Sequence, residues 1–205
     1  MINEKKIEMA NAVTHGLGAI LFLAISPLLL IFPVIKGDLT MAYVNSGYIC
    51  CLLITYFSST IYHATTDVFF KRRMRIMDHI SIFLLIGGTF TPLAFKFMEG
   101  WIFLLVFWLI ILAGIIFKIY FTGRFKFLST FFYLAIAWVA AMFSGEMFRN
   151  MPQDAFYYLM IGGAFYSVGT VFYMWKKLMY HHAIWHLFVL GGSIFHFLSV
   201  YVSVK

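Results

Sequence analysis

Charged residues are scarce in this sequence, where Asp, Glu, Lys and Arg together make up 11% of 205 residues. Soluble domains carry about 25% charged residues, so this scarcity excludes an ordinary soluble fold. Cysteine is almost absent: the sequence holds only Cys50 and Cys51, and adjacent cysteines rarely pair, so no disulfide framework is implied. Linkers and low-complexity tracts are also lacking, and we therefore expect a single domain over residues 1–205.

Hydrophobic residues, by contrast, make up 63% of the sequence and aromatic residues 20%, with a mean hydropathy of +0.92. Charged residues divide the chain into seven apolar stretches, most of them close to the roughly 20 residues that cross a bilayer core. We expect transmembrane helices at about 16–35, 42–62, 79–97, 100–118, 127–145, 155–175 and 183–204. The sequence thus predicts an all-α integral membrane protein, a seven-transmembrane-helix bundle that crosses the cell membrane several times.

The basic residues predict how this bundle is inserted. One set of alternate loops holds eleven of the fifteen Lys and Arg residues, and the other set holds four. The positive-inside rule places the richer set in the cytoplasm, so we expect a cytoplasmic amino terminus and a carboxyl terminus outside. The same bias explains the net charge of +7 without a nucleic acid. We expect membrane lipid, and no nucleic acid, as the partner.

Four ionisable residues stand near span ends, where burying them is costly and a functional role is typical. His63 lies near the end of the second expected span, Asp78 directly precedes the third, and His182 and His186 lie at the start of the seventh. In the predicted topology all four lie at cytoplasmic ends of their helices. Residues far apart in the sequence are therefore expected at similar membrane depth.

The histidine spacing is typical of a metal site. His182 and His186 are four residues apart, so their Cβ atoms lie about 6 Å apart on one helix face, and two imidazoles can bind one ion. His63 completes a three-histidine set with an open fourth position, the arrangement of catalytic zinc, which lowers the pKa of bound water to about 7. Asp78 is the candidate to take that proton, and Ser59 lies one turn before His63.

Simpler interpretations compete with this one. Histidine pairs at this spacing are common, and interfacial histidines often contact lipid head groups or water. Asp78 can pair with Arg75, and the Ser59 hydroxyl can bond the backbone carbonyl of residue 55. His15, at the start of the first expected span, can approach the same site, whereas His196 lies about 15 Å farther along its helix than His186.

Several segments resemble the haemolysin III family, the bacterial branch of the superfamily that contains the progestin and adipoQ receptors. They are Ser59-Thr60-Ile61-Tyr62-His63, Asp78-His79, Gly88-Thr89-Phe90-Thr91-Pro92, His182-Ala183-Ile184-Trp185-His186, and the set Glu8, Asn11, Thr14, His15 and Gly16. The resemblance implies seven helices and an intramembrane Zn²⁺ held by His63, His182 and His186. It further implies that Asp78 lies near the zinc-bound water and that Ser59 is the family's serine.

Three functions remain open at this point. The adiponectin receptors of that superfamily are associated with ceramidase activity, which implies a zinc-dependent hydrolase acting on a lipid amide or ester. The family name implies a pore-forming haemolysin instead, although we see no helix with a polar stripe along its whole length. The third hypothesis is a receptor or membrane-homeostasis sensor in which the zinc is structural.

Overall fold

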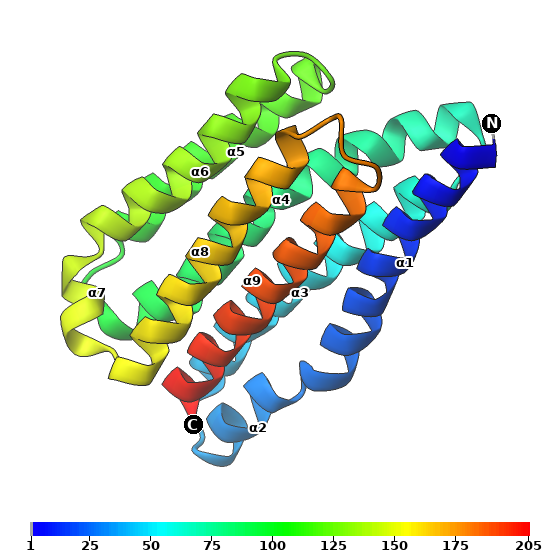
Figure 1. Cartoon of the computed structure of the whole chain (residues 1–205). Helices are drawn as coiled ribbons and strands as arrows, with labels where there is room; N and C mark the ends of the chain where they lie inside the picture. Colours follow the sequence, from blue (N-terminus) through cyan, green and yellow to red (C-terminus); the bar gives the residue numbers. More distant parts are fainter. Residues whose placement is uncertain (1) are drawn as a thin grey trace.

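The computed structural model describes residues 2–205, so only Met1 of the expected domain lies outside it. These residues form a bundle of helices (Figure 1), and no strand occurs among them. The helices are α1 (Ile2–Ile25), α2 (Leu28–Ile35), α3 (Leu39–Ala64), α4 (Val68–Phe97), α5 (Ile102–Phe121), α6 (Lys126–Phe143), α7 (Gly145–Asn150), α8 (Gln153–Met174) and α9 (His181–Val204).

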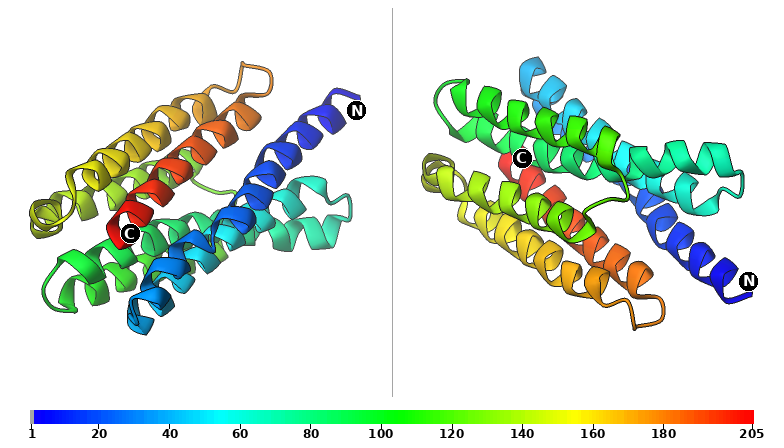
Figure 2. Two further views of the ribbon diagram at one scale, coloured as in Figure 1. Left: turned by 90° about the horizontal axis from the view of Figure 1, so that it is seen from below. Right: turned by 90° about the horizontal axis from the view of Figure 1, so that it is seen from above.

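The long helices run up and down the bundle between two ends. At one end, called the histidine end below, α1, α4 and α9 begin and α3 and α8 finish (Figures 1 and 2). The opposite end, called the carboxyl-terminal end, holds α2, α7 and the end of α9. This alternation brings His63, late in α3, to the same end as His182, early in α9.

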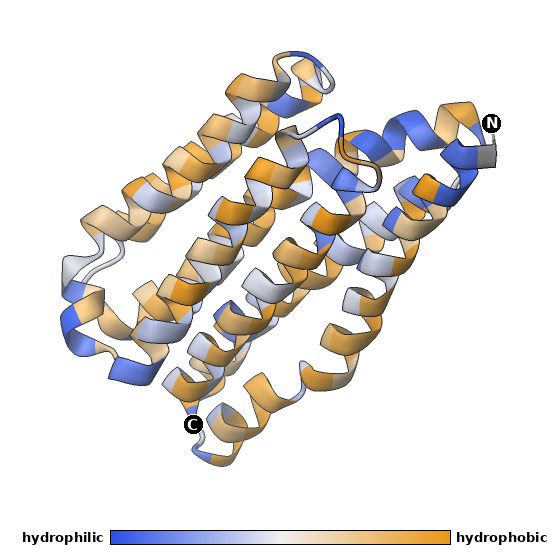
Figure 3. Ribbon diagram, viewed as in Figure 1, coloured by the Kyte–Doolittle hydropathy of each residue, from blue (hydrophilic) through white to orange (hydrophobic). Residues whose placement is uncertain are grey.

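Six segments are long and apolar enough to cross a membrane: 3–35, 39–64, 68–97, 102–121, 153–174 and 181–204. The remaining expected span, 127–145, overlaps a shorter apolar helix at Phe127–Phe143. Figure 3 shows hydrophobic residues along the middle of the helices and hydrophilic residues gathered at the two ends. The prediction of an all-α protein with several membrane spans is therefore confirmed.

Two helices extend well beyond the apolar stretches expected to cross the membrane. Helix α1 begins at Ile2 rather than near Gly16, and it ends at Ile25, before a turn at Ser26 and Pro27 that leads into α2. Helix α4 begins at Val68 because the Asp67 carboxylate accepts a hydrogen bond of 2.7 Å from the backbone N–H of Phe70. Hydropathy reports only the apolar part of such helices, so it places their polar first turns in loops.

The helices approach one another closely at small residues. A Cβ on Gly88 of α4 would lie 2.7 Å from the Cβ of Cys51 in α3, and one on Gly162 of α8 would lie 2.9 Å from the Gly192 carbonyl oxygen in α9. Close approach at glycine is a usual basis of helix packing in membranes. These contacts join α3 to α4 and α8 to α9.

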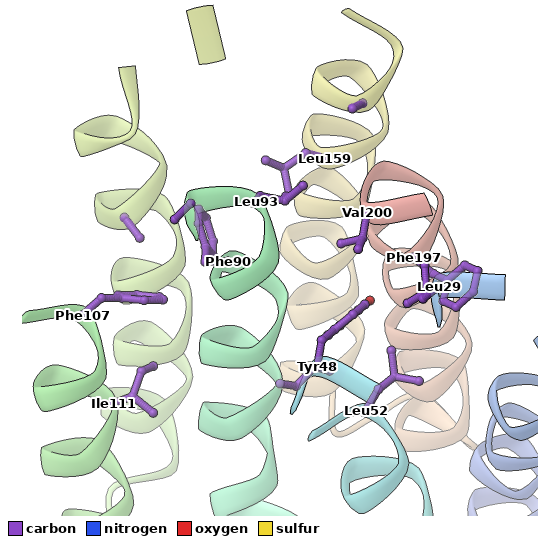
Figure 4. Close-up of a cluster of buried hydrophobic side chains, with 14 of the residues drawn as sticks. Leu29, Tyr48, Leu52, Phe90, Leu93, Phe107, Ile111, Leu159, Phe197 and Val200 are labelled. Carbon is purple, nitrogen blue, oxygen red and sulfur yellow. The ribbon is translucent and has the colours of Figure 1, made fainter. Parts of the chain in front are cut away.

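The apolar core lies mainly towards the carboxyl-terminal end. Figure 4 shows part of this core as one cluster of buried side chains from α2, α3, α4, α5, α8 and α9, among them Leu29, Tyr48, Leu52, Phe90, Leu93, Phe107, Ile111, Leu159, Phe197 and Val200. Almost all of the polar candidates from the sequence lie at the other end of the bundle. The fold thus separates a packed apolar region from a polar one.

Candidate metal centre

The structure brings three histidines together at the histidine end. One ring nitrogen from each of His63, His182 and His186 lies within 4.8 Å of the other two. The ring centroids are 5.0 Å apart for His63 and His182, 5.2 Å for His63 and His186, and 4.5 Å for His182 and His186. Helix α3 supplies one ring and the first two turns of α9 supply the other two.

The Nε2 atoms of all three rings are buried and have no hydrogen-bond partner in the protein. An unpaired polar atom in a buried place is costly, so a group of three such nitrogens is typical of a site that can bind a metal ion. Zinc–nitrogen bonds of about 2.1 Å place tetrahedral ligand atoms about 3.4 Å apart. A modest approach of the rings therefore suffices, and the donor set fits a metal ion.

The opposite nitrogens of two rings are fixed by α1. His63 Nδ1 lies 3.0 Å from Glu8 Oε2, and His186 Nδ1 lies 3.1 Å from the backbone oxygen of Asn11. Both oxygens can only accept, so each Nδ1 carries the hydrogen and donates it. This tautomer leaves the Nε2 lone pairs free, as a metal ligand requires.

Two further contacts support the same arrangement. Thr14 Oγ1 lies 3.0 Å from His186 Nδ1, and the Lys71 ammonium donates a 2.9 Å hydrogen bond to the same Glu8 oxygen that His63 contacts. Metal-binding histidines usually have such partners, which fix the ring orientation. Glu8 therefore orients the His63 ring, and the Lys71 ammonium compensates the negative charge of the Glu8 carboxylate.

Reasoning from hydropathy and depth missed Glu8, Asn11 and Thr14, which entered only through the family resemblance. They lie in the polar first half of α1, before the apolar stretch expected to form the first span. A signal was available: Glu8, Asn11 and His15 follow helical spacing of three and four residues and so share one face.

His15 does reach the site. Its ring is 2% exposed and stacks on His186, with centroids 3.6 Å apart and planes 20° apart. Both ring nitrogens of His15 are buried without a hydrogen-bond partner. This imidazole is therefore available to a water molecule or a bound ligand.

Ser59 and Asp78 have different surroundings. Ser59 is fully buried, and its hydroxyl makes no hydrogen bond, so the alternative bond to the carbonyl of residue 55 is not formed. Asp78 is not among the three clustered residues; its Oδ2 lies 3.6 Å from His79 Nδ1. The Asp78 side chain instead forms part of the wall of a neighbouring cavity.

That cavity has a volume of about 150 Å³ and lies mainly among α4, α6, α8 and α9. Asp78, His15 and His182 are on its wall, and it extends along apolar residues of the bundle, including Ile82, Leu85, Ile86, Leu134, Leu159 and Val189. A water molecule takes up about 30 Å³ of liquid, so the space suits several waters or part of a lipid chain.

Fold and site together define a multi-pass α-helical membrane protein whose three clustered histidines can hold a metal ion beside a largely apolar cavity. Comparison with known proteins then gives the family. Residues 3–197 match the model of the family described as "Haemolysin-III related". The chain belongs to the haemolysin III family, as the resemblance predicted.

Comparison with individual proteins gives relatives of the same kind. The chain is 40% identical to a "Hemolysin-3 homolog" of Bacillus subtilis (strain 168) over 198 residues, which cover 95% of this chain and 93% of the relative. It is 38% identical to "Hemolysin-3" of Bacillus cereus, over 95% of this chain and 90% of that one. A more distant relative is the human "Monocyte to macrophage differentiation factor", 25% identical over 78% of this chain and 68% of the relative.

Proposed function

We propose that this protein is a membrane-embedded hydrolase that uses zinc held by His63, His182 and His186 to cleave a lipid amide or ester. One observation carries the proposal: three buried, unpartnered Nε2 atoms lie beside a cavity with a polar end and apolar walls. Three imidazoles that leave a ligand position open are typical of catalytic rather than structural zinc. The cavity gives a lipid access to that position.

The remaining site residues have separate tasks in this proposal. Bound zinc supplies Lewis-acid polarisation of a carbonyl oxygen and activation of water. The Asp78 carboxylate, on the cavity wall, accepts the proton from the attacking water and returns it to the leaving group. The Ser59 hydroxyl and the His15 ring have unpaired polar atoms, and they hydrogen-bond the water or the lipid carbonyl.

The insertion that supports this chemistry follows from the basic loops. We propose one domain with seven spans, α6 being the fifth, and with the amino terminus in the cytoplasm. Lys71, Arg72, Arg73 and Arg75 lie in the first turns of α4, at the histidine end, as the positive-inside rule requires for a cytoplasmic end. The lipid then reaches the zinc from the cytoplasmic leaflet.

The test is a search for hydrolysis products by mass spectrometry after incubating the purified protein with lipid amides and esters. We expect fatty-acid release that a chelator abolishes, that added zinc restores, and that Asp78→Asn lowers by about 10²-fold or more. Asp154→Asn, in the first turn of α8 at the opposite end, is the matched control and retains activity. Zinc-bound, folded protein without any product would contradict the hydrolase and favour structural zinc.

A pore-forming haemolysin is the second candidate, and one observation favours it. Polar residues occur along the buried face of α9 from the histidine end to the carboxyl-terminal end: His186, Ser193, His196, Ser199 and Ser203. His196 and Ser199 donate to backbone carbonyls of α8, so this face would have to open to water before it could conduct ions. A pore predicts that liposomes containing the pure protein leak ions and that His63→Ala leaves the leak unchanged.

A further inference from the structure

Lys118 is a buried cation on the wall of the cavity. It lies one turn before the end of α5 and is 2% exposed. Its Nζ donates a 2.7 Å hydrogen bond to Ser129 Oγ and lies 5.7 Å from the centre of the Tyr133 ring. None of the ion pairs found within residues 2–205 includes Lys118.

A second cation lies close by. A Cβ on Gly123 would lie 2.6 Å from Arg75 Nη2, so the Arg75 guanidinium rests against the backbone of the α5–α6 turn. Gly123 has φ of +85°, a conformation that favours glycine. Both Gly123 and Lys118 are on the cavity wall. The positive charge at this end of the cavity is therefore built into the fold.

The nearby carboxylate does not neutralise Lys118. Asp78 lines the same cavity, but the ion pair described for it is with His79, at 3.6 Å. Lysine near a helix end usually extends its ammonium to bulk water, whereas Lys118 is turned inward to Ser129. A buried cation without a counter-charge is costly unless a ligand supplies that charge.

We propose that Lys118 binds the anionic oxygen group, phosphate or carboxylate, at the head of a membrane lipid. The inference rests on the proposed function and narrows its substrate class to anionic lipids. Lys118 and the histidine site share the cavity wall with apolar residues of α4, α6 and α8. Such a lipid can therefore present its head to Lys118, its chain to the apolar wall and its scissile bond to the site.

The test compares lipids that differ only in the head group. Oleoyl lysophosphatidate is paired with monooleoylglycerol, and oleate with oleyl alcohol; binding to the detergent-solubilised protein is measured by native mass spectrometry. We expect one or both anionic lipids to bind about tenfold or more tightly than their neutral partners. The pair with the larger difference in affinity identifies whether Lys118 prefers a phosphate or a carboxylate. The assay uses chelator-treated protein, so binding does not depend on zinc or on turnover.

Lys118→Met should abolish this preference while the protein remains folded, since it removes an unpaired buried charge. Lys118→Arg should keep it. Lys36→Met is the matched control: Lys36 caps the carboxyl-terminal end by donating to the Lys205 carbonyl oxygen. Equal binding of charged and neutral lipids, or an unchanged preference in Lys118→Met, would overturn the inference.

The remaining outcomes separate the two proposals. Competition by inorganic phosphate alone, as effective as lysophosphatidate, would overturn the assignment to a lipid. A Lys118-dependent preference without any hydrolysis would contradict the hydrolase and leave this site intact. Hydrolysis of neutral lipids at a rate that Lys118→Met does not change would support the hydrolase and contradict the anionic-lipid site at Lys118.

Discussion

The two ends of the bundle differ in whether their buried polar groups have hydrogen-bond partners within the protein. At the carboxyl-terminal end, the buried Ser199 hydroxyl donates to the Ala155 carbonyl oxygen at 2.7 Å, and the buried Ser203 hydroxyl donates to the Ser199 carbonyl oxygen at 2.8 Å. At the histidine end, the ring nitrogens that face one another have no protein partner. Within residues 2–205, ten buried side-chain atoms lack a partner, and eight belong to Asn11, His15, Ser59, His63, His181, His182 and His186.

A layer of satisfied groups separates the two ends. Tyr56 donates a 2.9 Å hydrogen bond to Ser193 Oγ, and the Tyr166 hydroxyl lies 2.7 Å from the same oxygen. In a membrane the unpaired groups beyond this layer cannot rely on bulk water, so they are costly in the free protein. We therefore expect the carboxyl-terminal end to supply stability and the histidine end to bind ligands.

The largest expected effect comes from removing one of the three clustered imidazole rings at the histidine end. His186→Ala deletes one of the three facing nitrogens, and we expect the metal content to fall from about one zinc per chain to near zero. Elemental analysis of the purified protein measures this, with His63→Ala as a second test. Zinc supplies three or four strong bonds, so its loss or chelation should also lower the midpoint of thermal unfolding.

His196→Ala is the matched control for that measurement. His196 is a buried histidine on the same helix, but its Nε2 donates to the Leu159 carbonyl oxygen at 3.2 Å. We expect this variant to retain all of its metal while losing stability. Equal metal loss in both variants, or no metal in carefully handled wild type, would contradict the division between the ends.

A smaller effect should follow from the groups on α1 that orient the ligands. Glu8→Gln weakens the acceptor for His63 Nδ1 and removes the charge that faces Lys71. Changes of this kind typically reduce metal affinity about 10–100-fold. Competition with a fluorescent zinc chelator measures the affinity of the folded variant.

The control is the carboxylate of Glu146, at the opposite end, which accepts a 2.9 Å hydrogen bond from the backbone N–H of Glu99. Glu146→Gln should leave zinc affinity unchanged. If the two variants bind zinc equally, Glu8 has no role in orienting His63.

Much of this division could be predicted from the sequence. Apolar stretches and loop charges placed His63, His182 and His186 at one end, because a bilayer forces consecutive helices to alternate in direction. The helical spacing of His182 and His186 put both on one face. Hydropathy and topology are therefore enough to limit the candidate site to one end of the bundle.

The contacts themselves could not be predicted in this way. Glu8 and Thr14 lie in a polar part of α1 that hydropathy excludes from a span, and only packing against α3 and α9 gives them a role. The cavity depends on how closely α6 approaches α4 and α8, which no local pattern in the sequence records. Lys118 stands at the end of the expected 100–118 span, and only the structure gives its inward hydrogen bond to Ser129.

The smallest effect, and the sharpest test of the comparison, contrasts two fully buried serines. Ser199 Oγ donates a 2.7 Å hydrogen bond to the Ala155 carbonyl oxygen, whereas Ser59 Oγ has no partner. Ser199→Ala should cost about 1 kcal/mol of unfolding free energy, since hydrogen bonds between membrane helices are of that order. Ser59→Ala should cost close to nothing, because it removes an unsatisfied hydroxyl.

Reversible unfolding in mixed micelles measures both variants under identical conditions. If the histidine end exists for ligands, Ser59→Ala should preserve stability and still slow lipid hydrolysis, while Ser199→Ala should do the opposite. A loss of stability in Ser59→Ala equal to that in Ser199→Ala would show that the Ser59 hydroxyl is bound within the fold. The polar groups of the histidine end would then serve stability, as those of the carboxyl-terminal end do, rather than ligand binding.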